Sequence, residues 1–190
     1  DSQHFAVFGE GTYALTNRLD LTVGGRAGID WSSINFTGLD LATFAPLAFT
    51  KQVEFSSFQP KASLGYQLTD ELRVYGLVSQ GYKPGGFNHA VSFAADALPY
   101  RPETAWNYEI GSKSRLMDGR GSFNLSVFYI DISNLQATLT AGTCSSRVVF
   151  NVPKSRSIGG EAELAMAPNE HFDFAVSAGY HDATLQSTVT

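Results

Sequence analysis

The chain has 190 residues, of which 16% are charged, and its formal net charge is −5. The acidic balance argues against a nucleic-acid partner, and no run approaches the ~18 consecutive apolar residues of a membrane helix. The charged fraction is below the roughly one quarter of an ordinary soluble domain, as expected for strands with one apolar face and one face of small or polar residues.

Apolar and polar residues alternate along most of the chain, which predicts two-faced β-strands. Pro60 lies inside the third of these strands and has no N–H to donate, so we expect a bulge or a local break there. Eight strands are expected, in chain order, at residues 3–14, 19–31, about 55–68, 72–82, 104–116, 121–132, 155–166 and 172–182.

The connections between these strands differ strongly in length. Short turns at one end of a sheet and long loops at the other are typical of a bacterial outer-membrane β-barrel. Alternation alone fits a soluble sheet equally well, but this asymmetry, together with aromatic residues near strand ends such as Trp31, favours the membrane. The short turns are centred near Asn17, Asp70, Asp118 and Asn169, and the long loops are expected at residues 32–54, 83–103 and 133–150.

Large apolar residues and charged residues fall on opposite parities of the predicted strands. In a membrane barrel the apolar parity faces lipid and the polar parity lines the lumen. We also expect neighbouring strands to pair antiparallel in sequence order, with the first and eighth strands not paired to each other. We expect one set to point away from the barrel axis, Leu21, Val23, Leu125, Val127, Phe174 and Val176, and another to point inward, Arg26, Lys113, Asn124, Glu161 and Ser177.

Residues that would carry catalysis or bind a metal do not cluster in the sequence. His4, His89, His171 and His181 are scattered without the spacing of metal ligands. Cys144 is the single cysteine, so it has no disulfide partner within the chain. No Ser/His/acid set, paired carboxylates or glycine-rich phosphate loop is evident. We therefore expect a protein that is not an enzyme, with no catalytic residue, bound metal or cofactor.

Four segments carry a more specific pattern. Residues 79–88 read SQGYKPGGFN, residues 101–113 read RPETAWNYEIGSK, residues 128–136 read FYIDISNLQ, and Asn151 precedes the GEAE of residues 160–163. In this order, separated by hairpins, they resemble segments of TonB-dependent outer-membrane receptors of the siderophore type. The chain departs from that pattern at one position within the third segment, where asparagine replaces a common aspartate.

The resemblance implies an all-β fold, an antiparallel up-and-down transmembrane β-barrel of twenty-two strands whose lumen is plugged by an N-terminal domain. On this interpretation, residues 1–190 are a partial barrel domain of about eight strands, without the plug domain and the C-terminal strands. An open piece of this kind would have two unpaired edges, which lipid does not tolerate.

The resemblance also implies a function. A receptor of this family sits in the outer membrane of a Gram-negative bacterium, contacts its lipid, and imports a scarce ligand, most often a ferric siderophore, by active transport. The implied partners are that ligand, the plug domain of the same protein and the TonB energy-coupling complex, which acts through the plug. The motifs do not specify the ligand, because the loops determine it.

Candidate ligand contacts lie in the long loops, where the ligand is first met. Lys83 and Arg101 offer positive charge to an anionic chelate, and Phe87 offers an aromatic face. A competing interpretation is that the glycines at 85 and 86 form only a structural turn at the barrel rim. The full set of candidates is Tyr82, Lys83, Phe87, Asn88, Tyr100 and Arg101.

A second set of candidates lies on the inward parity of the strands. These charged side chains either bind the plug domain or pair with one another in a solvated ladder along the lumen. The set consists of Arg26, Glu109, Lys113, Arg115, Glu161 and Glu163.

Two other functions remain open from the sequence. A self-contained eight-stranded outer-membrane barrel with a structural or adhesive role would require the first and eighth strands to pair. A soluble carbohydrate-binding β-protein would place Leu125 and Phe174 in a closed apolar core.

Overall fold

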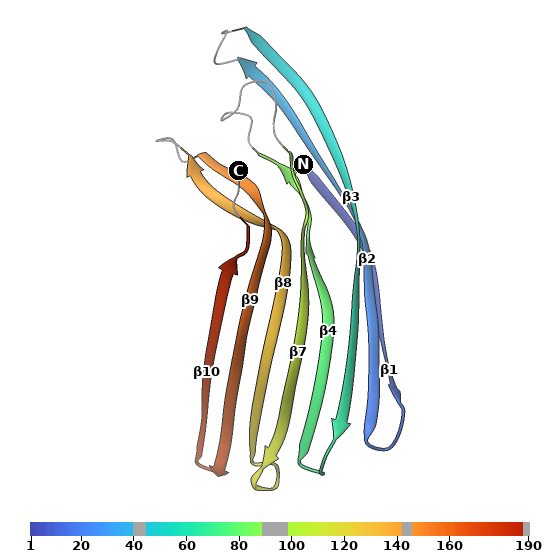
Figure 1. Cartoon of the computed structure of the whole chain (residues 1–190), viewed down its shortest axis with the longest axis vertical. Helices are drawn as coiled ribbons and strands as arrows, with labels where there is room; N and C mark the ends of the chain where they lie inside the picture. Colours follow the sequence, from blue (N-terminus) through green and yellow to red (C-terminus); the bar gives the residue numbers. More distant parts are fainter. Residues whose placement is uncertain (40–44, 89–98, 142–145, 188–190) are drawn as a thin grey trace.

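Eight long strands form one antiparallel sheet in the computed structural model (Figure 1). The structure describes residues 1–39, 45–88, 99–141 and 146–187, so His89 and Cys144 lie outside the described residues. Within these ranges, no helix is long and apolar enough to cross a membrane. The sheet consists of β1 (Ser2–Ala14), β2 (Leu19–Leu39), β3 (Pro46–Gln67), β4 (Leu72–Lys83), β7 (Glu103–Leu116), β8 (Gly121–Ala141), β9 (Ser146–Asn169) and β10 (Phe172–Leu185).

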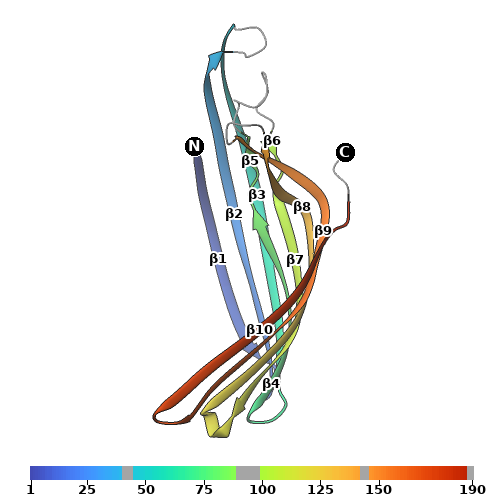
Figure 2. The ribbon, with the colours of Figure 1, turned by 90° about the vertical axis from the view of Figure 1, so that its left-hand side faces the viewer.

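Neighbouring strands pair antiparallel in sequence order, with β1 and β10 at the two edges. The four short turns, one of which contains the 3₁₀ turn η2 (Met117–Gly119), lie together at the bottom of Figure 1. Both features confirm the predicted topology. Over the described residues β1 and β10 do not pair with each other, so the alternative of a self-contained eight-stranded barrel is wrong. The sheet is twisted, and β2 and β3 extend past the loop ends of the other strands (Figure 2).

The cross-strand register gathers the large apolar residues on one face. Leu21 is opposite Leu64, Leu64 is opposite Gly76, and Gly76 is opposite Ile110, which is opposite Val127. Because side chains alternate between the two faces of a strand, the same register places the other predicted members on this face: Val23, Leu125, Phe174 and Val176.

The opposite face is polar. Arg73 is opposite Lys113, Lys113 is opposite Asn124, and Asn124 is opposite Glu163, which in turn is opposite Ser177. Arg26 and Glu161 have the same parity on their strands. The predicted separation of the two sets onto opposite faces is therefore confirmed.

The apolar face is not covered by any of the residues that the structure describes. Val152 is the only buried apolar side chain among the described residues, whereas Leu125 is 46% exposed and Val176 is 61% exposed. A soluble β-protein would bury such a face in a core between two sheets, and a membrane barrel presents it to lipid. The alternative of a soluble carbohydrate-binding protein is therefore contradicted.

The predictions of long loops at residues 32–54 and 133–150 are wrong, because the strands continue through most of both stretches. β2 and β3 stay paired beyond Trp31, where the Phe36 and Phe49 rings stack with centroids 5.4 Å apart and the Thr50 hydroxyl donates to Asn35 Oδ1 at 2.8 Å. β8 and β9 likewise stay paired up to residues 141 and 146. The apolar alternation continues in these stretches, at Ile34 and Phe36 on β2 and at Leu135 and Leu139 on β8, so period two extends beyond the predicted strand ends.

The ladder between β3 and β4 ends at Lys61 and Ser79, next to Pro60, whereas β2 and β3 stay paired through Pro60. Gln67 donates its amide to the Arg18 carbonyl, on the β2 side, at 2.7 Å. Backbone polar groups alternate in direction along a strand, so odd-numbered residues of β3 bond toward β2. The missing N–H of Pro60 is then on the β4 side, and the predicted break is confirmed there alone.

A side chain connects the strands where this ladder ends. The Gln80 amide satisfies groups on both sides when its nitrogen donates to the Phe58 carbonyl oxygen at 2.7 Å and its oxygen accepts from Trp106 Nε1 at 3.3 Å. Gln80 thus joins β3, through β4, to β7.

Some glycines of the polar face leave room for an aromatic ring of the adjacent strand. A Cβ on Gly111 would lie 2.6 Å from the Tyr75 ring, and a Cβ on Gly159 would lie 2.6 Å from the Phe128 ring. In the register Gly111 is opposite Tyr75, and Gly159 is opposite Phe128. Each ring therefore lies against the sheet over the glycine, which no larger residue could share.

We predict that Gly111→Ala makes the protein less stable than Gly76→Ala by about 1–3 kcal/mol, because the new methyl group must displace the Tyr75 ring. Gly76→Ala is the matched control: it removes the same backbone freedom, and the atom nearest to its Cβ is the Glu109 carbonyl oxygen at 4.0 Å. Urea unfolding of the folded protein in detergent micelles measures both free energies. Equal values would mean that the ring does not occupy the space over Gly111.

Candidate functional site

A short segment crosses the polar face of the sheet at its loop end. It consists of residues 84–88 and 99–101, here called the crossing segment, in which β5 (Gly86–Phe87) pairs with β6 (Pro99–Tyr100). β5 contacts β2, and β6 contacts β9. The crossing segment therefore bridges strands that are separated by most of the sheet.

Close packing explains why residues 85 and 86 of the crossing segment are glycines. A Cβ on Gly85 would lie 2.6 Å from the Phe55 ring, and a Cβ on Gly86 would lie 2.5 Å from the Tyr100 hydroxyl. Both glycines are buried. The interpretation of this stretch as a structural turn thus has a physical basis, since any larger residue would push the segment off the sheet.

Asn88 attaches the crossing segment to β9. Its side-chain oxygen accepts from the Val149 amide at 2.7 Å, and its side-chain nitrogen donates to the Val149 carbonyl at 2.8 Å. The Asn88 side chain thereby acts like the backbone of a neighbouring strand, and the residue is only 6% exposed.

Two further side-chain amides attach the last and the first residue of the crossing segment. Asn151 accepts from the Arg101 amide at 2.7 Å and donates to the Arg101 carbonyl at 2.9 Å. Gln136 donates to the Pro84 carbonyl at 2.8 Å, while its own backbone amide donates to Glu103 at 2.7 Å. Asn151 and residues 128–136 belong to the family-like motifs, so part of those motifs serves to hold this segment.

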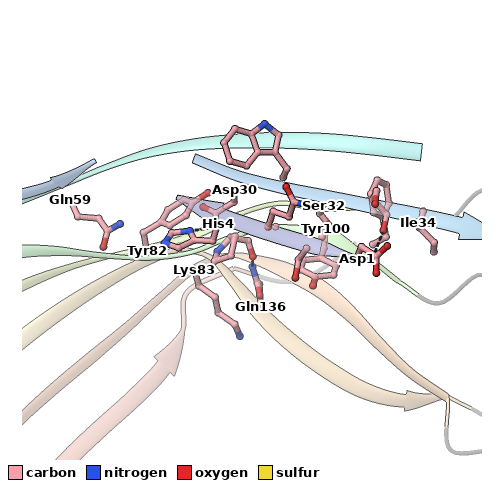
Figure 3. A pocket seen from close by; sticks show the side chains of 18 of the residues that line it. Asp1, His4, Asp30, Ser32, Ile34, Gln59, Tyr82, Lys83, Tyr100 and Gln136 are labelled. Atoms are coloured by element: carbon pink, nitrogen blue, oxygen red, sulfur yellow. Dashed lines mark hydrogen bonds and ion pairs between the residues drawn. The ribbon is translucent and has the colours of Figure 1, made fainter. Parts of the chain in front are cut away.

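A cavity of about 800 Å³ lies between the crossing segment and the polar ends of β1 and β2 (Figure 3). Four of the six predicted ligand contacts line it, namely Tyr82, Lys83, Phe87 and Tyr100. Asn88 does not line it, and its polar atoms are engaged with Val149. Arg101 is also outside the lining and is exposed. Residues that line the cavity but were not foreseen from the sequence include His4, Asp30, Trp31 and Gln136.

His4 links two charged side chains in the wall of the cavity. Its Nδ1 lies 2.7 Å from Asp30 Oδ1, and its Nε2 contacts an Arg26 guanidinium nitrogen. Arginine can only donate, so Nε2 must accept, and Nδ1 then carries the proton that it donates to Asp30. The arrangement requires a neutral imidazole. We call His4, Arg26, Asp30 and the adjacent Tyr82 the relay wall.

Other candidates on the inward parity are spread along the polar face, and of the six only Arg26 reaches the cavity. Glu109 accepts from the Tyr75 hydroxyl at 2.7 Å, and the Lys113 ammonium lies 5.7 Å from the centre of the Tyr75 ring. Glu163 accepts from Asn124 at 3.5 Å. These contacts join members of the set to uncharged side chains, so pairing of the charges with one another stays a prediction.

The two remaining candidates differ from these in position. Arg115 donates to the Asp70 carbonyl at 2.6 Å, at the turn end of the sheet, and Glu161 lies opposite Ser126 on the polar face. Among the described residues, no group of three or more His, Cys, Asp or Glu side chains could hold a metal ion.

Comparison with known proteins identifies relatives along nearly the whole chain. The family model described as the β-barrel of TonB-dependent receptor-like proteins matches residues 1–189. The pesticin receptor of Yersinia pestis is 31% identical over 162 residues, which cover 85% of this chain and 23% of that receptor. The ferric-pyoverdine 358 receptor of Pseudomonas putida is 29% identical over 123 residues, or 65% of this chain and 14% of that protein.

Solved structures show the same fold. The ferric yersiniabactin uptake receptor of Yersinia pestis superposes with a TM-score of 0.78 at 27% identity, covering 97% of this chain and 28% of that one. A ferric-catecholate import receptor of Escherichia coli superposes with a TM-score of 0.73 at 18% identity, covering 98% of this chain and 28% of that one. The chain thus spans about a quarter of the length of these two structures.

We predict that Asn88→Ala accelerates hydrogen exchange at the Val149 amide by about tenfold or more, because that N–H loses its acceptor. Asn35→Ala is the control, since it removes an exposed side-chain amide from the β2–β3 pair and leaves Val149 untouched. Exchange followed by mass spectrometry on the folded protein measures the rate. Unchanged protection of Val149 in Asn88→Ala would contradict the role of Asn88 as an anchor.

Proposed function

This chain belongs to the TonB-dependent receptor β-barrel family, and we propose that the whole receptor imports a ferric siderophore by TonB-coupled transport. Members of this family are transporters of the Gram-negative outer membrane and not enzymes. The observation that carries the proposal is the cavity of about 800 Å³ at the loop end of the polar face. Its size lies within the range of small-molecule sites, roughly 300–1,000 Å³.

The names of the relatives support the choice of ligand class. One is a receptor for a ferric pyoverdine and another is the uptake receptor for ferric yersiniabactin. We extend that class, and no particular member of it, to this protein.

The residues around the cavity suit an anionic chelate with aromatic groups. Lys83 lines the cavity and is exposed, so its ammonium can meet a negatively charged ligand. Tyr82, Phe87 and Tyr100 supply rings at the same place. Arg101, at the end of the crossing segment, would act earlier, as an exposed charge that attracts the ligand from a distance.

The proposed partners follow from the two faces. Lipid of the outer membrane covers the apolar face, and a plug domain of the same receptor contacts the inward charges, among them Arg115 and Glu161, whereas Arg26 lies in the cavity wall. The inner-membrane TonB complex supplies energy through that plug. The lumen contacts within this chain, such as Glu109 with Tyr75, leave further carboxylate and ammonium groups available to a plug.

We predict that growth on the cognate ferric chelate as the only iron source stops when the TonB partner is deleted, because the barrel wall supplies no energy of its own. The measurement compares iron uptake in cells that carry the receptor with and without the partner. Uptake that continues unchanged without the partner would indicate passive diffusion, and the protein would then act as a porin.

We predict that Lys83→Glu weakens binding of an anionic ferric chelate to the receptor by about tenfold, since a favourable charge becomes a repulsive one. Lys154→Glu is the control, because Lys154 is an exposed lysine of β9 that does not line the cavity. Fluorescence quenching titrations at low and high salt measure both affinities. A loss of the same size in the control would point to the overall charge of the receptor instead of the cavity.

A further inference from the structure

The relay wall contains three buried polar atoms that have no hydrogen-bond partner among the described residues: Arg26 Nε, Asp30 Oδ2 and Tyr82 Oη. All three residues line the cavity, where Figure 3 labels Asp30 and Tyr82 beside His4, and Asp30 is only 9% exposed. Burial of an unpaired polar atom is costly, so most such atoms in proteins have a partner. Three of them around one cavity indicate a site that a hydrogen-bonding group completes.

We propose that the relay wall is a subsite for an uncharged amide or hydroxyl group of the imported ligand. The inference rests on the proposed import function and specifies which part of the ligand this wall binds. It differs from the role given to Lys83, which meets the charge of the chelate.

The charges of the relay wall cancel one another. The Arg26 guanidinium and the Asp30 carboxylate are joined through the neutral His4 ring. A ligand carboxylate would be repelled by the free oxygen of Asp30, and a ligand ammonium would be repelled by Arg26. The wall therefore offers hydrogen bonds without a net charge for an ion to neutralise.

The unpartnered atoms also differ in kind. Arg26 Nε can only donate, Asp30 Oδ2 can only accept, and the Tyr82 hydroxyl can do both. A group that completes this set must itself contain a donor and an acceptor. Primary amides and hydroxyl groups have both, whereas an ether, an ester or a tertiary amide has acceptors only and would leave Asp30 Oδ2 unpaired.

The geometry of Asp30 permits a substitution that changes only one of its two hydrogen-bonding atoms. Asp30→Asn keeps the size of the side chain and an oxygen that can accept from His4 Nδ1, the bond that is 2.7 Å long here. The second oxygen then becomes an NH₂ group, so an acceptor is replaced by a donor at the position of Oδ2. Tyr82→Phe removes a hydroxyl that has no partner in the part of the chain that the structure describes, so neither change should disturb folding.

The test compares two probes on the full-length receptor: a ferric trihydroxamate with a primary carboxamide arm and the same chelate with an N,N-dimethyl amide arm. We expect the unmodified receptor to bind the primary amide about tenfold more tightly, the usual effect of one hydrogen bond. Asp30→Asn should abolish this preference, and Tyr82→Phe should reduce it. Ser177→Ala, on the polar face but away from the cavity, should retain it.

The outcomes separate this inference from the proposed function. Tight binding of both chelates with no preference between them, or a preference that survives in Asp30→Asn, would overturn the subsite and leave the import function intact. Failure of the receptor to bind any ferric chelate would contradict the import function itself and, with it, the premise of the subsite.

Discussion

The structure depends on one constraint: inside lipid, every backbone N–H and C=O group must be bonded within the protein. Each pair of neighbouring strands satisfies this with an antiparallel ladder, which in the β9–β10 pair contains a register shift between Phe172 and Phe174. The β3–β4 ladder ends beside Pro60, and there Gln80 reaches across to β3 and to Trp106. Trp106 stacks with Tyr108, which in turn contacts Tyr129, and aromatic groups of this kind mark the membrane boundary of barrels. The gap therefore begins where water can replace the missing strand bonds.

The site at the loop end depends on the same sheet in a different way. The relay wall belongs mainly to β1 and β2, whereas Asn88 and Asn151 tie the crossing segment to the other side of the sheet. Side-chain amides make these attachments by bonding to backbone groups, so the segment needs no ladder of its own. The cavity lies between these two parts, each of which has its own hydrogen bonds, and β5 of the crossing segment also contacts β2.

How much of the fold and of the site could be predicted from the sequence depends on how far apart in the chain the interacting residues lie. The two faces and the turns followed from periodicity, because alternation at Leu21 or Lys113 is a local property of one strand. The upper parts of β2 and β3 were missed although Ile34 and Phe36 continue the alternation, because polar residues such as Asn35 favoured a loop. His4 and Asp30 were missed as site residues because their contact depends on register across 26 residues, and Asn88 was expected at the ligand because its partner, Val149, is 61 residues away.

The glycines of the polar face have a consequence for the width of the channel. Where Tyr75 lies over Gly111 and Phe128 over Gly159, a large ring packs against the wall instead of extending into the lumen. The bore of the barrel is thus set partly by positions that have no side chain at all. A family member with alanine or valine at such a position would have to raise the neighbouring ring toward the axis, and its lumen would be narrower although its number of strands stayed the same.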